Sequence, residues 1–180
     1  MPFKINQIKS DNSVVSDFDS KLNLEELIKI FREESGLKFI NRSTPFLINY
    51  KNSGIYIILK NIVYSGNPAS HDRKRVQVDS KSLNFIQTND AYIIGIYSYD
   101  KQRIFCLPNR ERFIGRNTKS YTSAHIHIKH LLNAKNQGYF RNQRGDVLFT
   151  KQFFTKVLDE LISDHSLSCD NLKEILIRLN

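Results

Sequence analysis

The sequence has few of the features that mark secreted, membrane-spanning or nucleotide-binding proteins. Its only cysteines are Cys106 and Cys169, with no CxxC motif between them, so no disulfide framework is indicated. No apolar run approaches the ~20 residues of a membrane span, and no signal-peptide core opens the chain. P-loop, dinucleotide-binding and GxSxG motifs are also missing. We therefore expect a cytoplasmic protein with reduced thiols, no membrane contact and no cofactor.

Acidic residues are scarce in one stretch of the chain. Between Lys101 and Lys151, eleven lysines and arginines face only Glu111 and Asp146, a net +9 that equals the formal charge of the whole chain. The remaining 16 basic and 16 acidic residues cancel. A neutral protein with one basic segment is typical of polyanion binding. The simpler interpretation is a solvated loop of a basic protein.

The hydrophobic pattern predicts an α+β, mainly β protein with helices at both ends. Apolar residues recur at helical spacing from Leu24 to Phe31, with Asn23 and Glu26 placed for a capping box and Gly36 for the C-terminal cap. A second stripe of this kind begins at Phe153. It is followed by the pattern of Leu172, Ile175, Leu176 and Leu179. Residues 1–20 are polar, and we expect them to be loosely held.

The centre of the chain changes to the period and composition of short strands. Strands are expected at Phe46–Tyr50, Gly54–Tyr64, Arg75–Asp79, Tyr92–Tyr99, Arg103–Leu107, Ser123–Ile128 and near Phe149. Asp100 to Gln102 suits a tight hairpin, and Ser82–Thr88 suits one or two helical turns. The expected fold is a seven-stranded open β-barrel (a pseudobarrel) in a single domain of residues 1–180. Its parts are an N-terminal extension and helix (1–36), the barrel (37–150) and C-terminal helices (151–180).

Two polar segments interrupt the strands, near 65–75 and near 109–122. Strandless stretches of this length inside a compact domain are usually functional or disordered. Both carry Arg, Asn and Ser, and this combination reads base edges and phosphates together. Few aromatic residues are interleaved, which favours double-stranded DNA over single strands.

One triplet pair is typical of a nuclease. Gly54-Ile55-Tyr56 is followed by Tyr64-Ser65-Gly66, which resembles the opening of GIY-YIG nucleases. In those enzymes a tyrosine lies near the scissile phosphate and an arginine holds the phosphate. The resemblance also requires a carboxylate for a divalent metal, and Glu111 is the one candidate. A buried strand with aromatic residues explains the same pattern.

Two weaker patterns suggest metal chemistry. Asp79-Ser80-Lys81 matches half of a common (D/E)xK nuclease site, with Asp72 as a poorly placed partner. His125, His127 and His130 have spacing that could bind zinc. No cysteine or acid follows at ligand spacing, and a strand with polar residues facing a groove explains the histidines more simply. We therefore expect neither a metal nor catalytic residues in this chain.

The order of elements from about Tyr50 to Phe149 resembles the B-three-like pseudobarrel DNA-recognition domain. This domain occurs in plant transcription factors and in restriction endonucleases of the EcoRII, BfiI and LlaJI types. The matching stretches are IYIILKNIVYSGNPASHDRKRVQV, AYIIGIYSYDKQRIFCLPN and RERFIGRNTKSYTSAHIHI. The resemblance implies two arms that clasp the major groove, an N-arm at Tyr64–Gln77 and a C-arm at Arg110–His125. It also implies a target-recognition part of a restriction subunit, with motor and nuclease supplied by further domains or subunits.

These considerations predict sequence-specific binding of double-stranded DNA. Alternatives from other classes are a small GIY-YIG-type nuclease and an RNA-binding module. The expected DNA-binding residues are Tyr64, Ser65, Asn67, Ser70, His71, Arg73, Lys74, Arg75, Gln77, Arg110, Arg112, Arg116, Asn117, Thr118, Lys119, Ser120, Tyr121, Thr122, Ser123, His125, Arg141 and Arg144.

Overall fold

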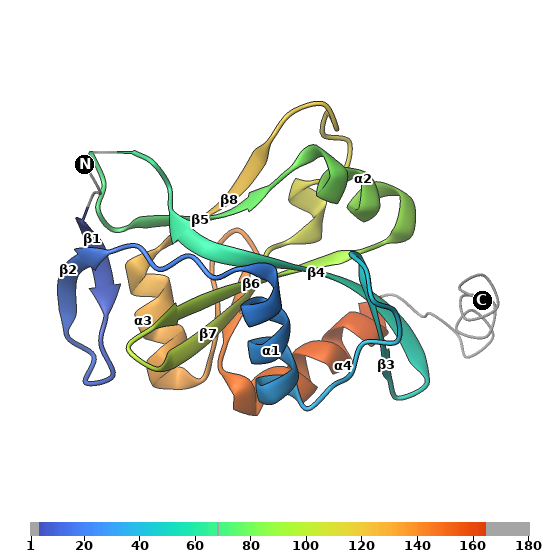
Figure 1. Ribbon diagram of the computed structural model, residues 1–180, viewed down its shortest axis with the longest axis horizontal. Helices are drawn as coiled ribbons and strands as arrows, with labels where there is room; N and C mark the ends of the chain where they lie inside the picture. The colour runs from blue at the N-terminus through green and yellow to red at the C-terminus, as the bar shows by residue number, and fades with distance from the viewer. Residues whose placement is uncertain (1–3, 68, 165–180) are drawn as a thin grey trace.

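A computed structural model describes residues 4–67 and 69–164 of the chain (Figure 1). The fold is α+β and mainly β, as the sequence predicts. The strands are β1 (Lys4–Ile8), β2 (Val14–Phe18), β3 (Phe46–Tyr50), β4 (Ser53–Tyr64), β5 (Arg73–Val78), β6 (Tyr92–Tyr99), β7 (Gln102–Leu107), β8 (Thr122–His127), β9 (Tyr139–Arg141) and β10 (Val147–Phe149). The α-helices are α1 (Leu24–Ser35), α2 (Ser80–Asn89), α3 (Ile128–Gln137) and α4 (Phe154–Asp164), and the 3-10 turns are η1 (Arg110–Arg112) and η2 (Lys151–Phe153).

The main sheet is a curled, open half-barrel. Seven strands follow one path in the order β8-β5-β4-β6-β7-β10-β9, and β3 pairs with β4 beside that path. The long strand β4 organises the sheet, because its first part pairs with β3 and β6 while its last residues pair with β5. The two ends of the path, β8 and β9, are not paired with each other. The expected open barrel is thus confirmed, with a seam between β8 and β9.

The curl depends on a close approach of strands at Gly95. A methyl group added to Gly95 of β6 would lie 2.6 Å from Cγ2 of Val76 and 3.0 Å from Cγ1 of Ile62. Only a residue without a side chain allows β4 and β5 to pass this near β6. The sheet therefore bends over its own inner face, which α2 and α3 also cover, while α1 and α4 pack on the other face.

Local sequence signals specify several elements. Helix α1 has the expected capping box, because Asn23 Oδ1 accepts from the Glu26 N–H and the Glu26 carboxylate accepts from the Asn23 N–H. Gly36 ends the helix with φ of 72°. The β6–β7 hairpin turns at Asp100 and Lys101, both with positive φ. Such paired left-handed residues match the twist of the flanking strands, so the expected helix and hairpin are confirmed.

Three elements differ from the expectations. Residues 4–18 form a hairpin rather than a loose segment, because Ile5 and Ile8 are fully buried and the Ile8 N–H donates to Tyr97 Oη at 2.9 Å. Helix α3 follows β8 directly and was not expected, and neither was the three-residue strand β9. Cys106 is a free, buried cysteine, whereas Cys169 and the expected terminal helix lie outside the described residues.

Lys74 was expected to contact DNA, and the structure contradicts this expectation. Its side chain is fully buried, with Nζ donating to Gln7 Oε1 at 2.9 Å and lying 5.4 Å from the centre of the Tyr97 ring. Burial lowers the pKa of Lys74 from its usual 10.5 to about 8, although the charges of Asp19 and Asp72 act in the opposite direction. Lys74 therefore links β5 to the N-terminal hairpin and cannot reach a ligand from this position.

The buried cation predicts a particular pH dependence of stability. Between pH about 8 and about 10.4 the folded chain has released the Lys74 proton and the unfolded chain has not, so the free energy of unfolding rises with pH in this window. Lys74→Met should remove that rise. It should also raise the free energy of unfolding near pH 7 by about 1–3 kcal/mol. Urea denaturation of both proteins near pH 7 and near pH 9.5 measures the difference. A variant that is less stable at both pH values would contradict this assignment.

Candidate nucleic-acid interface

The two predicted arms meet in the structure as neighbouring strands. Strand β5 belongs to the N-arm and β8 to the C-arm, and they pair antiparallel along their whole length (Figure 1). The pairing sets Arg75 opposite His125 and Gln77 opposite Ser123. Since alternate residues of a strand share a face, these side chains and Arg73 project together on the face opposite the core. Val76 and Ile126, on the other face, are fully buried.

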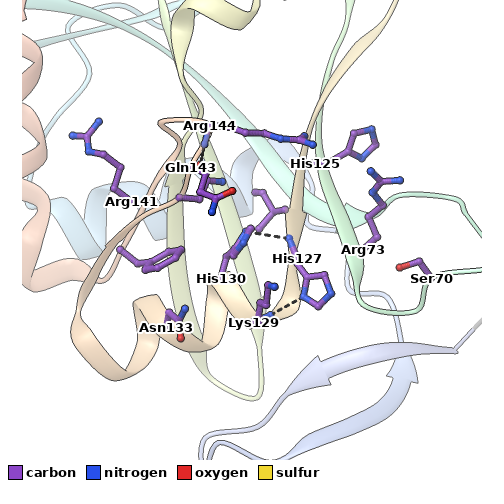
Figure 2. A pocket seen from close by; sticks show the side chains of 13 residues that line it. Ser70, Arg73, His125, His127, Lys129, His130, Asn133, Arg141, Gln143 and Arg144 are labelled. Atoms are coloured by element: carbon purple, nitrogen blue, oxygen red, sulfur yellow. Dashed lines mark hydrogen bonds between the residues drawn. The ribbon is translucent and has the colours of Figure 1, made fainter.

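A groove of about 850 Å³ runs along the seam of the half-barrel. Strand β8 and the start of β5 form one wall, the β9–β10 turn forms the other, and the first turns of α3 lie between them (Figure 2). The lining residues are Ser70, Arg73, His125, Ile126, His127, Lys129, His130, Asn133, Phe140, Arg141, Asn142, Gln143 and Arg144. They include four lysines or arginines and three histidines but no acidic residue. We call this the seam groove.

The electrostatic field in the seam groove disfavours further positive charge. The pKa of His125 lies below its ordinary value, first because the ring is partly buried and then because Arg73, Arg112, Arg144 and Arg75 repel a proton there. The pKa of His130 is lowered as well, chiefly by burial and then by His127 and Lys129. Both imidazoles are therefore neutral near pH 7, and the groove is suited to an anion.

Several expected DNA-binding arginines instead hold the local structure. Arg110 forms an ion pair with Asp90 and also donates to the Ile86 carbonyl. Arg112 donates from Nη1 to both oxygens of the fully buried Asp146 carboxylate, at 2.9 and 2.8 Å. Arg141 pairs with Glu160 at 3.0 Å. These side chains fix the path of the C-arm and of β9, so their charges are already partly balanced.

The side chains of three other expected DNA-binding arginines make no contact of this kind. Within residues 4–67 and 69–164, no side chain or carbonyl makes a hydrogen bond or ion pair with the guanidinium groups of Arg73, Arg75 and Arg144. Arg73 and Arg144 line the seam groove, and Figure 2 shows the Arg144 side chain extending across it toward His125. Arg75 lines a second hollow of about 450 Å³ together with Gln77 and Tyr121. Two of these three arginines thus lie on β5, and the third reaches toward β8 from the opposite wall of the groove.

The tips of the arms hold the remaining expected residues. In the C-arm, Asn117 closes a turn by accepting from the Lys119 N–H, Arg116 donates to the Arg112 carbonyl, and Tyr121 is 70% exposed. Thr118, Ser120 and Thr122 lie in the same segment, at or near the surface. In the N-arm, Asn67 closes a turn at Ala69. Ser65 is buried, Tyr64 ends β4, and His71 Nδ1 lies 3.2 Å from the Lys4 carbonyl.

Sequence reasoning missed part of the seam groove. Lys129, Asn133 and Gln143 line it but were not expected. Lys129 and Asn133 are on α3, whose apolar positions Ile128, Leu131 and Ala134 face the core at helical spacing. That spacing could have predicted helix α3, but the alternating pattern of the preceding strand made the segment look like part of a strand.

The alternative active sites receive little support. Tyr56 and Tyr64 lie on the single strand β4, eight residues and thus about 26 Å apart, so they cannot serve one phosphate together. Asp79 is the N-cap of α2 and pairs with Lys60. Burial acts to raise the pKa of Asp79, but the hydrogen bonds from Lys60 and Ser82 lower it to about 2. This carboxylate therefore stabilises a helix start.

The histidines have structural partners too. His127 Nδ1 accepts from the Lys129 N–H, and His130 Nδ1 accepts from the His127 N–H, which together cap α3. In the part of the chain that the structure describes, no group of three or more His, Cys, Asp or Glu is placed to hold a metal ion. Nor do these residues include a helix long and apolar enough to cross a membrane.

Comparison with known proteins identifies a family for this chain. No curated protein and no solved structure matches the chain. The model of one family, described as methylase-associated X1, matches residues 53–158. This range runs from β4 into α4 and includes both arms and the whole seam groove. The resemblance to B-three-like DNA-recognition domains stays a prediction. The family is linked to restriction-modification systems, in which a methylase is the modification enzyme, and this chain belongs to the methylase-associated X1 family.

Proposed function

We propose that this chain is the DNA-recognition domain of a restriction-modification system and binds double-stranded DNA at specific sequences. The observation that carries the proposal is the seam groove, which gathers Arg73, Lys129 and Arg144 with no acidic residue in its lining. Charges of one sign in a concave site raise the local concentration of a polyanion. The family's association with methylases fits a protein that shares a DNA target with a modification enzyme.

The β5–β8 pair supports duplex DNA as the ligand. The major groove admits a two-stranded ribbon, and its base edges pair with forked donors and amides. Arg75 and Gln77 on β5 lie opposite His125 and Ser123 on β8, so one face presents side chains of this kind. Cations on both sides of such a ribbon suit the two phosphate backbones. The B-three-like resemblance, with its two major-groove arms, leads to the same assignment.

The proposed function places no catalytic site in this chain. The tyrosines of the GIY-YIG resemblance lie far apart on β4, and Asp79 caps a helix. We therefore propose that the chain itself does not cut DNA and that partner domains or subunits supply the motor and the nuclease.

Selection from random duplexes, with and without Mg²⁺, tests the function directly. The expected result is enrichment of one short duplex sequence, equal in both conditions and with no strand cleavage. Metal-dependent cleavage that disappears in Glu111→Ala would favour the nuclease instead. Preference for folded RNA over every duplex would favour the RNA-binding alternative.

The division of arginines predicts which substitutions reduce DNA binding. Arg73→Gln and Arg144→Gln should each weaken binding and make the negative slope of log affinity against log salt shallower by about 1. The reason is that each removes from the groove a cation that has no partner within the protein. Arg32→Gln on α1 is the charge-matched control, since Arg32 is exposed on the other face of the sheet. Fluorescence anisotropy titrations at several salt concentrations give both quantities. Equal losses in all three variants would indicate a general charge effect and contradict the assigned surface.

A further inference from the structure

His125 belongs to the strand wall of the seam groove. It lies on β8 opposite Arg75 of β5. In Figure 2 the Arg144 side chain reaches across from the β9–β10 turn toward this ring, and the Arg73 side chain from the start of β5 lies beside it. Two guanidinium groups that have no hydrogen-bond or ion-pair partner among the described residues therefore approach the same imidazole, one from each wall of the groove.

The ring of His125 lacks a partner that its neighbours have. Among the three groove histidines, His127 and His130 each accept a backbone hydrogen bond at Nδ1. By contrast, Nδ1 of His125 is buried and has no hydrogen-bond partner among the described residues. A buried polar atom without a partner costs free energy, and one explanation for such an atom in a native protein is a water or ion that completes its hydrogen bonds.

The charges around His125 explain why it stays neutral in the free protein. Arg73 and Arg75 face it from β5, Arg112 from η1 and Arg144 from the β9–β10 turn, and all four oppose a proton there. Asp146, the carboxylate bound to Arg112, is fully buried and also accepts from the Asn109 N–H and from Asn142 Nδ2. Its charge is thus already compensated. An imidazolium at His125 would meet four cations and leave a buried N–H without an acceptor.

A phosphate in the groove would reverse both conditions. Its oxygens would accept hydrogen bonds from the imidazole and from the two flanking guanidinium groups, and its charge would favour an imidazolium. We propose that the seam groove holds one phosphate of the DNA backbone between Arg73, Arg144 and His125, and that His125 takes up a proton when the phosphate enters. This inference rests on the proposed DNA binding and adds a defined anion subsite and a linked proton.

Linkage fixes the sign of the effect. If His125 is neutral when free and protonated when bound, the bound state carries one more proton between the two pKa values. DNA affinity must then rise as the pH falls through this interval, by at most tenfold per pH unit for one proton. At pH values above both pKa values the affinity no longer changes with pH.

The test measures the affinity of the full chain for its selected duplex from about pH 6 to about pH 8 at constant ionic strength. Wild-type affinity should be about five- to tenfold higher at the lower pH. Calorimetry near pH 7 in two buffers of different ionisation enthalpy should show proton uptake on binding. Inorganic phosphate should compete with the duplex, and less effectively in Arg144→Gln.

Two variants at one position isolate the linked proton. His125→Gln should bind weakly with little pH dependence, whereas His125→Lys carries a permanent charge and should bind as tightly as the low-pH wild type, also with little pH dependence. Thermal denaturation checks that both are folded. Wild-type binding that does not change with pH, or a pH dependence that persists in His125→Gln, would overturn this inference alone. Absence of duplex binding at every pH would overturn the proposed function and this inference together.

Discussion

The seam groove depends on the hydrogen bonds of the buried Asp146 carboxylate. A fully buried charge is tolerated only when partners compensate for its lost hydration. Asp146 receives both contacts of Arg112, the backbone N–H of Asn109 and the side-chain amide of Asn142. These partners come from the start of the C-arm and from the β9–β10 turn. The cluster therefore ties the start of the C-arm to the turn that carries Arg144.

The same cluster changes the meaning of the charge pattern. Asp146 is one of only two acids in the basic segment, and its burial removes it from the surface that a ligand meets. Some arginines of the segment are used to build the walls, as Arg112 and Arg141 show. Arg144 stays free, and Arg73 joins it from the N-arm, far away in the sequence. The candidate interface is thus made by folding, from cations that structural contacts leave available.

Short-range signals made part of this fold predictable. The capping residues of α1, the left-handed turn between β6 and β7 and the alternation along β5 and β8 are all written in neighbouring residues. The pairing of β5 with β8 joins residues about fifty positions apart, and no local signal fixes that register. The burial of Lys74 was hidden for a related reason, because its partner Gln7 belongs to a hairpin that the polar N-terminal composition concealed. The groove itself could not be predicted, since its walls require the pairing of β5 with β8 and the unexpected elements α3 and β9.

The most direct measurement of the central claim is a map of backbone amide signals by NMR as a duplex of the selected sequence is added. If DNA lies along the seam, the signals that shift or broaden should cluster in residues 70–77, 122–130 and 140–145. Those of α1 and α4, which cover the other face of the half-barrel, should stay in place. Changes centred on α1 and α4 with the seam unaffected would contradict the account.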